Sequence, residues 1–234
     1  MAQDFIIFSK IKMMKISKLF FLLILIFSVV VSKAQKSISE GTLIYNINIV
    51  SLKNEPIANA LNGASVTVYL KGGLSRTDMV SSLGMEKTIH DAKTGAAVIL
   101  KEYSGQKLMI TLSKENWEEK NKKSEGLVFV KQNETKEILG YSCTKANTKL
   151  KDGTSVAVFY TKDLSINNKD YDPTFMNLDG VPLQYEFESE KIKFVYTISK
   201  IDFNSLPIAK FDFPKMGYRV MTYNENKAGK KSSL

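Results

Sequence analysis

Apolar and polar residues alternate along most of the chain beyond residue 40. Residues 41–50 read GTLIYNINIV, so Leu43, Tyr45, Ile47 and Ile49 share one face of an expected strand. Similar patterns predict further strands at 64–71, 75–81, 85–91, 96–102, 106–112, 127–130, 181–188 and 191–203. Turn residues separate these segments at short intervals, which is typical of a meandering antiparallel sheet or a barrel. The pattern therefore predicts a mainly β fold.

Residues 134–161 carry the strongest hairpin signal. The segment 151–154 reads KDGT, and an Asp-Gly pair tolerates the positive φ that a tight turn needs. Val156, Val158 and Tyr160 share one face of the outgoing strand, and 140–143 lie in the incoming one. We expect two strands joined by this turn.

The alternation changes phase inside the longest expected strand, 191–203. Ile192 and Ile198 occupy even positions, whereas Ile201 and Phe203 occupy odd ones. A shift of one residue moves side chains to the opposite face. The sequence therefore predicts a β-bulge, or a crossing between sheet regions, at residues 199–200.

Three segments lack the strand pattern. Residues 56–61 begin with proline and precede Asn62-Gly63, which indicates one or two helical turns. Residues 113–123 (SKENWEEKNKK) are polar and helix-permissive, with Ser113 as the expected cap. Residues 162–179 form a long polar connection, and connections of this length are often functional.

A 13-residue apolar run, residues 19–31, follows Lys15 and Lys18 and precedes Ser-Lys-Ala. A bilayer-spanning helix needs roughly 20 residues, so the pattern indicates a secretory signal cleaved after Ala34. A single membrane anchor is the alternative. We expect a signal at 1–34 (with Met14 as a plausible start), one β-rich domain at 35–226 and a flexible basic tail at 227–234. The expected location is the periplasm or envelope.

The chain has a formal net charge of +9. The expected signal holds five lysines and one aspartate and so accounts for +4 of it. The remaining +5 is spread along the sequence rather than gathered in a basic stripe, so a nucleic-acid partner is not expected. Weak attraction to anionic membrane surfaces is compatible with this charge. The only cysteine, Cys143, excludes an internal disulfide, and we expect it to be a small strand residue.

The sequence offers no catalytic set. His90 is the only histidine, and Asp91 beside it on a strand points to the opposite face, so we expect a histidine in a surface turn. One histidine and one cysteine exclude the usual zinc clusters. We therefore expect no enzymatic activity, no metal and no cofactor.

The feature that indicates ligand binding is a larger number of bulky apolar side chains than a simple sandwich of short strands needs. Methionine and aromatic side chains favour variable apolar ligands, although ordinary core packing is the alternative for each of them. The candidate pocket residues are Met79, Met109, Trp117, Phe129, Phe159, Phe175, Met176 and Phe194.

The 134–146 segment, ETKEILGYSCTKA, followed by VFYT at 158–161, resembles the "ETKxIxGYxCxKA…vwyT" block of a family of uncharacterised envelope proteins. Arg76, GVPL at 180–183 and FDFPKMGY at 211–218 fit other landmarks of that family. A second family, of secreted proteins with a GLPGLI landmark, is matched more loosely. The first family has no assigned activity and is similar in fold to the lipoprotein carriers LolA and LolB.

The resemblance implies a strongly curved, incomplete antiparallel barrel, a half-barrel with a few short helices on its concave side, where acyl chains can bind. We expect a non-enzymatic envelope protein that binds or carries a lipid or other apolar molecule. A membrane or a lipoprotein is a further candidate partner, and the sequence predicts no oligomeric state. The alternative is an envelope interaction or assembly module without a ligand cavity.

Overall fold

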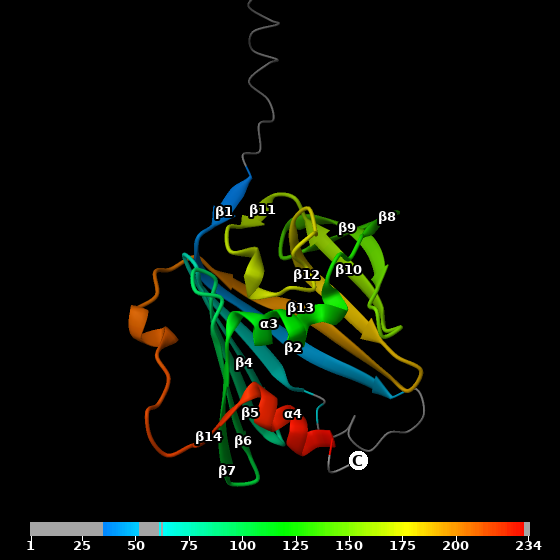
Figure 1. The fold of residues 1–234 in the computed structure, drawn as a ribbon. Coiled ribbons are helices and arrows are strands. Elements are labelled where there is room, and N and C mark those ends of the chain that lie inside the picture. Colours follow the sequence, from blue (N-terminus) through cyan, green and yellow to red (C-terminus); the bar gives the residue numbers. More distant parts are fainter. Residues whose placement is uncertain (1–34, 52–60, 62, 232–234) are drawn as a thin grey trace, which may run out of the picture. The chain divides into compact units, whose positions relative to one another are not determined.

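The computed structural model describes residues 35–51, 61 and 63–231 (Figure 1). The expected signal, the expected helix at 56–61 apart from Leu61, and residues 232–234 lie outside the described residues. The described residues from 35 onward belong to one compact unit.

One twelve-stranded sheet accounts for most of the described chain. In spatial order its strands are β14 (Arg219–Thr222), β7 (Gln106–Leu112), β6 (Ala97–Tyr103), β5 (Gly84–Asp91), β4 (Leu74–Ser81), β3 (Ser65–Lys71), β2 (Glu40–Ser51), β13 (Ile192–Asp202), β12 (Val181–Glu188), β10 (Ser155–Thr161), β9 (Tyr141–Lys149) and β8 (Val130–Ile138). Neighbours are antiparallel except β14 and β7, which are parallel. A separate parallel pair joins β1 (Lys36–Ile38) to β11 (Leu164–Ile166).

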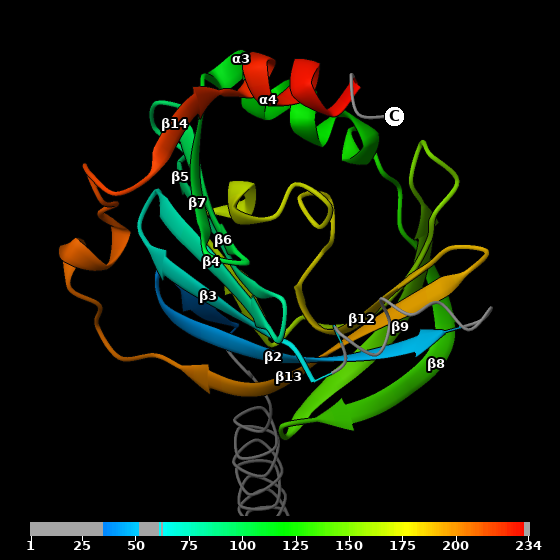
Figure 2. The ribbon, with the colours of Figure 1, turned by 90° about the horizontal axis from the view of Figure 1, so that it is seen from below.

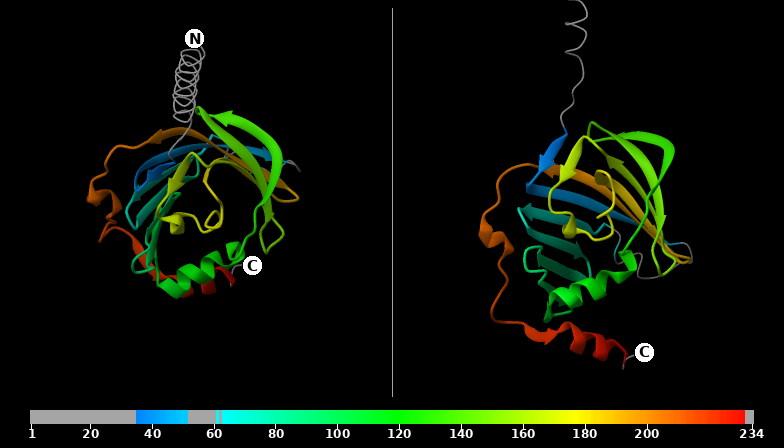
Figure 3. Two further views of the ribbon diagram at one scale, coloured as in Figure 1. Left: turned by 90° about the horizontal axis from the view of Figure 1, so that it is seen from above. Right: turned by 45° about the horizontal axis from the view of Figure 1, so that its top comes forward.

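The sheet bends into an arc that does not close (Figure 2). The segment between β11 and β12, which contains the 3-10 turn η2 (Lys169–Tyr171), lies inside the arc. Helix α3 (Lys114–Asn121) and the 3-10 turn η1 (Lys122–Ser124) lie across its open side, as Figures 2 and 3 both show. The expected fold, a curved antiparallel sheet with short helices on its concave side, is confirmed.

Most expected strands are present, and two local predictions need correction. The hairpin region holds three strands rather than two, because Leu139 and Gly140, both with positive φ, turn the chain between β8 and β9. Leucine rarely adopts positive φ, so this turn has only a weak signal in the sequence. Of the strand expected at 127–130, only Val130 belongs to β8.

The predicted bulge in β13 is confirmed. The pairing register between β13 and β2 shifts between Ile198 and Lys200, which leaves Ser199 as the extra residue. Its hydroxyl donates a hydrogen bond to the Ile44 carbonyl at 3.1 Å. The bulge therefore explains the change of phase in the sequence.

The main core lies on the concave side of β2, β3, β10, β12 and β13. Phe175 and Leu178, from the segment inside the arc, are buried in the same cluster as Tyr45, Val68 and Leu183. The chain thus fills much of the concave side with its own long connection. The long connection predicted to be functional is, over this part, a packed structural element.

A second cluster lies where α3 covers β6 and β7. Ile99, Ile110 and Leu112 are buried there, and Trp117 and Tyr223 pack against them. Tyr223 begins α4 (Tyr223–Lys231), so most of the tail predicted to be flexible at 227–234 is helical. Lys227 of α4 forms an ion pair with Glu119 of α3, which joins the two helices.

Candidate functional site

Helix α3 is short and polar, and its start is fixed by a capping box. The Ser113 hydroxyl accepts the backbone N–H of Asn116 at 3.3 Å, and the Asn116 side chain accepts the N–H of Ser113. Such reciprocal caps satisfy two otherwise unpaired donors of the first turn. The predicted cap at Ser113 is confirmed, and it fixes where Trp117 lies over the sheet.

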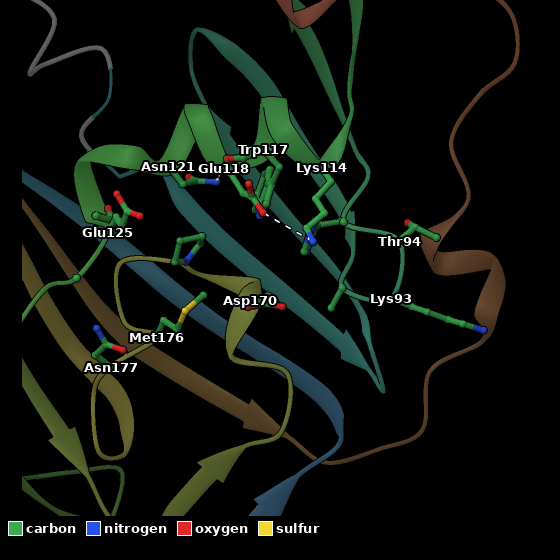
Figure 4. Close-up of a pocket in the computed structure, with 16 residues that line it drawn as sticks. Lys93, Thr94, Lys114, Trp117, Glu118, Asn121, Glu125, Asp170, Met176 and Asn177 are labelled. Atoms are coloured by element: carbon green, nitrogen blue, oxygen red, sulfur yellow. Dashed lines mark hydrogen bonds and ion pairs between the residues drawn. The ribbon is translucent and has the colours of Figure 1, made fainter.

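A pocket of about 460 Å³ lies between α3, the turn after β5 and the segment 170–177. In Figure 4, Trp117, Glu118 and Asn121 come from α3, and Asp170, Met176 and Asn177 come from the facing segment. Its lining residues are His90, Ala92, Lys93, Thr94, Gly95, Lys114, Trp117, Glu118, Asn121, Ser124, Glu125, Gly126, Asp170, Pro173, Met176 and Asn177. Its volume falls within the ~300–1,000 Å³ typical of small-molecule sites.

His90 and Trp117 form the aromatic part of this lining. Their ring centroids are 4.4 Å apart with an interplanar angle of 14°, which is a stacked pair. His90 is only 3% exposed, and neither of its ring nitrogens hydrogen-bonds a protein group. Burial lowers the pKa of His90, and the carboxylates of Asp170 and Asp91 partly oppose this. The neutral imidazole is therefore the favoured form.

The expectation of a surface histidine was wrong. His90 lies on the concave side of β5, beside Ser75 in the neighbouring strand, and α3 covers it. The sequence around His90 resembles a strand end followed by a turn, and it holds no sign that a helix more than 20 residues later lies over it. The expected separation of the His90 and Asp91 side chains is confirmed, because the Asp91 carboxylate accepts a hydrogen bond from the Lys93 N–H at 2.9 Å and none from His90.

Much of the remaining pocket lining is polar, and most of its charges are paired. Lys114 and Glu118 form an i,i+4 ion pair at 4.0 Å, and Glu125 accepts a hydrogen bond from Lys151 at 3.0 Å. The Lys151 ammonium lowers the pKa of Glu125. The Asn177 amide donates to a backbone carbonyl at 3.0 Å. The pocket is therefore amphipathic, with an aromatic wall and a polar rim.

Two of the eight predicted pocket residues, Trp117 and Met176, line this pocket. The structure places four others, Met79, Phe129, Phe175 and Phe194, in or against the main core. These four residues therefore have the positions expected from ordinary core packing, which was the alternative to ligand binding.

The last two predicted pocket residues are buried away from the pocket. Met109 packs with Val98, Leu100 and Tyr218 in a cluster of its own. Phe159 is buried against the main core, but it comes directly after Val158 on its strand. The ammonium groups of lysines 136 and 145 lie over its ring. Successive strand residues point to opposite faces, so alternation alone could have separated both residues from the concave ones.

Asp172 makes the centre of the arc polar. Burial raises its pKa, and the hydrogen bonds from Thr174 partly oppose this. Burial also raises the pKa of Tyr196, to about 12, with the Asp172 carboxylate adding to the effect. A cavity of about 40 Å³ lies between Asp172, Tyr45 and Tyr185, which is room for a water molecule or two. The concave side therefore holds a small polar cavity as well as the pocket beneath α3, which has the greater volume of the two.

Residues 54–169 match the model of a protein family described as "Domain of unknown function (DUF4412)". That range contains β3 to β10 and the whole of α3, and it ends one residue before Asp170 of the pocket. No curated protein matches the chain. The resemblance to the ETKxIxGYxCxKA block and to LolA and LolB stays a prediction.

Several solved structures are similar to this chain at low identity. PNGF-II in its P21 space group has 16% identity and a TM-score of 0.48, over 82% of this chain and 33% of that one. An uncharacterized conserved protein from Thermus thermophilus has 11% identity and a TM-score of 0.47, over 81% and 92%. The lipoprotein LppX of Mycobacterium tuberculosis has 10% identity and a TM-score of 0.38, over 71% and 88%. The chain spans about a third of the length of the PNGF-II structure.

Among the residues that the structure describes, no helix has the length and apolar character needed to cross a bilayer. In the same part of the chain, no three histidine, cysteine or carboxylate side chains are grouped as metal ligands would be.

Proposed function

We propose that this chain is a non-enzymatic binding protein of the cell envelope, and that the pocket beneath α3 holds a lipid chain or another apolar molecule with a polar end. The observation that carries the proposal is the pocket itself, a space of about 460 Å³ that the chain's own side chains leave open. The apolar run at residues 19–31 supports export to the envelope.

The lining supports an amphipathic ligand rather than a wholly apolar one. Trp117, Met176 and Pro173 offer apolar surface, and methionine adapts to ligands of different shape. The Lys114 ammonium and the second N–H of the Asn121 amide, whose first N–H donates to the Trp117 carbonyl, offer donors at the edge of the same pocket. A ligand with a hydrocarbon part and a hydrogen-bonding head matches both regions.

The proposal limits the size of the ligand, because Phe175 and Leu178 fill the neighbouring part of the concave side. A bulky ligand with several chains would require the segment 170–178 to leave its place. We therefore propose a ligand with a single apolar chain, or a compact apolar molecule.

Trp117 gives a direct assay, since it is the only tryptophan of the chain and lines the pocket. Residues 35–234 would be titrated with palmitate below its aggregation concentration while tryptophan emission is recorded. Native mass spectrometry of the same samples would give the stoichiometry. We expect a saturable change in emission and a one-to-one complex. The absence of both, together with no lipid on protein purified from its own envelope, would refute the proposal.

Met176→Glu is the informative variant, with Leu83→Glu as its control. Met176 lines the pocket and is 40% exposed, so a carboxylate there is tolerated by the fold but opposes an apolar chain. We expect the affinity for palmitate to fall about tenfold or more, where a tenfold change corresponds to about 1.4 kcal/mol. Leu83 is similarly exposed in the β4–β5 turn, and its replacement should leave the affinity unchanged.

A second candidate function is that of an interaction module, and the edge strand β8 favours it. This strand ends the sheet, so one row of its backbone groups has no strand partner among the described residues. Val128, Val130 and Leu139, which flank the strand or begin it, are exposed. An envelope protein could add a strand at this edge.

The two candidates are separable by one pair of substitutions. Val128→Lys combined with Val130→Lys should abolish crosslinking to a defined envelope partner while palmitate binding persists, if β8 is the functional surface. If the pocket is the functional site, the double variant should keep its function and Met176→Glu should lose it.

A further inference from the structure

The connection between β13 and β14 crosses the outer face of the sheet, and two of its attachments to the sheet lie on either side of residues 212–217. At the first, the Arg76 guanidinium donates to the Lys210 carbonyl at 2.8 Å and forms a bidentate pair with Asp78, with both distances 2.6 Å. At the second, the Tyr218 hydroxyl donates a hydrogen bond to the Glu102 carboxylate. Figure 1 shows this segment, in orange, outside the arc of strands.

Between these two points the chain is turned outward. Phe211, in the 3-10 turn η3 (Ile208–Phe211), is buried, but all six residues from 212 to 217 are exposed. Phe213 is 43% exposed, and Met216, at 87%, is the most exposed large apolar residue of the described chain. A loop held at both ends presents these side chains without having to order itself on binding.

Along the chain, most of the charged residues in and beside this loop are basic. Lys215 and Arg219 are exposed, and the ammonium of Lys210 lies 4.6 Å from the centre of the Tyr69 ring. Asp212 is the single acidic residue between 206 and 219. Apolar side chains among basic ones complement an anionic bilayer surface, where the basic groups meet the head groups and the apolar ones enter below them.

We propose that the loop 212–217 is a docking surface for anionic membranes, with Phe213 and Met216 entering the interface and Lys215 and Arg219 meeting lipid phosphates. This surface is on the outside of the sheet, whereas the pocket lining comes from α3 and the concave side. The proposal therefore stands independently of what the pocket binds.

Vesicle co-sedimentation of residues 35–234, which contain every described element, tests the proposal. The probes are vesicles of phosphatidylcholine alone and of phosphatidylcholine with phosphatidylglycerol in equal parts. We expect binding to the anionic vesicles, little binding to the neutral ones, and weaker binding as salt is raised. Lys215→Glu should lower the partition coefficient about fivefold or more, since a basic side chain near an anionic surface contributes about 1 kcal/mol.

Phe213→Ser combined with Met216→Ser should lower the partition on the order of tenfold, because two apolar side chains lose their burial. The matched control is Val80→Ser with Leu83→Ser, which removes two exposed apolar side chains from the β4–β5 hairpin and should bind like the original protein. Far-UV circular dichroism would establish that all variants are folded. No binding to anionic vesicles, equal binding to neutral ones, or an equal loss in the control would each overturn the proposal.

Discussion

Replacing Phe175 by alanine would remove a buried side chain by which the segment inside the arc packs against the concave side of the sheet. Phe175 is 4% exposed, and its ring centroid lies 4.8 Å from that of Tyr185 and 6.1 Å from that of Phe129. Phenylalanine-to-alanine changes in protein cores lower the free energy of unfolding by about 3–5 kcal/mol. Since whole domains are stable by only about 5–15 kcal/mol, we expect Phe175→Ala to remove a large share of the stability.

Thermal and urea unfolding, followed by circular dichroism, would measure the loss. For a domain of this length each kcal/mol lowers the Tm by about 2–4 °C, so the expected decrease is about 6–20 °C. Met176→Ala is the matched control, because Met176 is the next residue and is far more exposed. We expect that variant to lose less than about 1 kcal/mol.

The cavity left by Phe175→Ala gives a second readout. Empty apolar cavities of this kind take up small aromatic molecules, so benzene should raise the Tm of Phe175→Ala by more than it raises that of the original protein. A loss of stability no larger than that of Met176→Ala would refute the packed concave side. The protein would then have an open hollow large enough for a multi-chain lipid, and the limit on ligand size would be removed.

Three further predictions concern buried groups and one tight turn. Burial raises the pKa of Cys143 to about 11, so maleimide should label this thiol only after unfolding. Burial lowers the pKa of His90 in the folded state, so its contribution to stability is complete above its ordinary pKa of about 6.5. That contribution is lost as the pH falls towards the pKa of the folded state. Urea midpoints measured at neutral and acid pH should therefore differ less for His90→Phe than for the original protein. A Cβ at Gly84 would lie 2.0 Å from the Glu102 carbonyl oxygen, so Gly84→Ala should be less stable by about 1–3 kcal/mol, whereas Gly73→Ala, which meets only ordinary contacts, should unfold like the original protein.

The strands were predictable because most of them have one face against a core. In β3 the buried positions alternate strictly with half-buried ones, which is the period that 64–71 shows in the sequence. The bulge at Ser199 was predictable for the same reason, since the apolar face must stay on the core side while the register shifts. Both signals are local in the sequence, and both features are present in the structure.

The pocket was much less predictable, because it depends on contacts between residues distant in the sequence. Trp117 and Met176 were recognised as bulky apolar residues, but nothing near them indicates that His90 lies against Trp117. Asp170 and Asn177 looked like ordinary residues of a polar connection, and only the path of that connection inside the arc brings them to α3. Alternation assigns a residue to a face but does not say what covers that face.

Two different elements cover the concave side, and the pocket in which a ligand is proposed to bind lies between them. Beside Val68 of β3, the inward positions change from apolar residues to Thr77 and Thr88 on β4 and β5, and the apolar part is covered by Phe175 and Leu178. Farther along the sheet, Ile99 of β6 and Ile110 of β7 are apolar again, and the short polar helix α3 covers them with one large aromatic residue, Trp117. A space remains beneath that helix because the helix buries no residue completely. The amphipathic pocket is thus a consequence of covering one concave surface with two separate elements, the segment 170–178 and the polar helix α3.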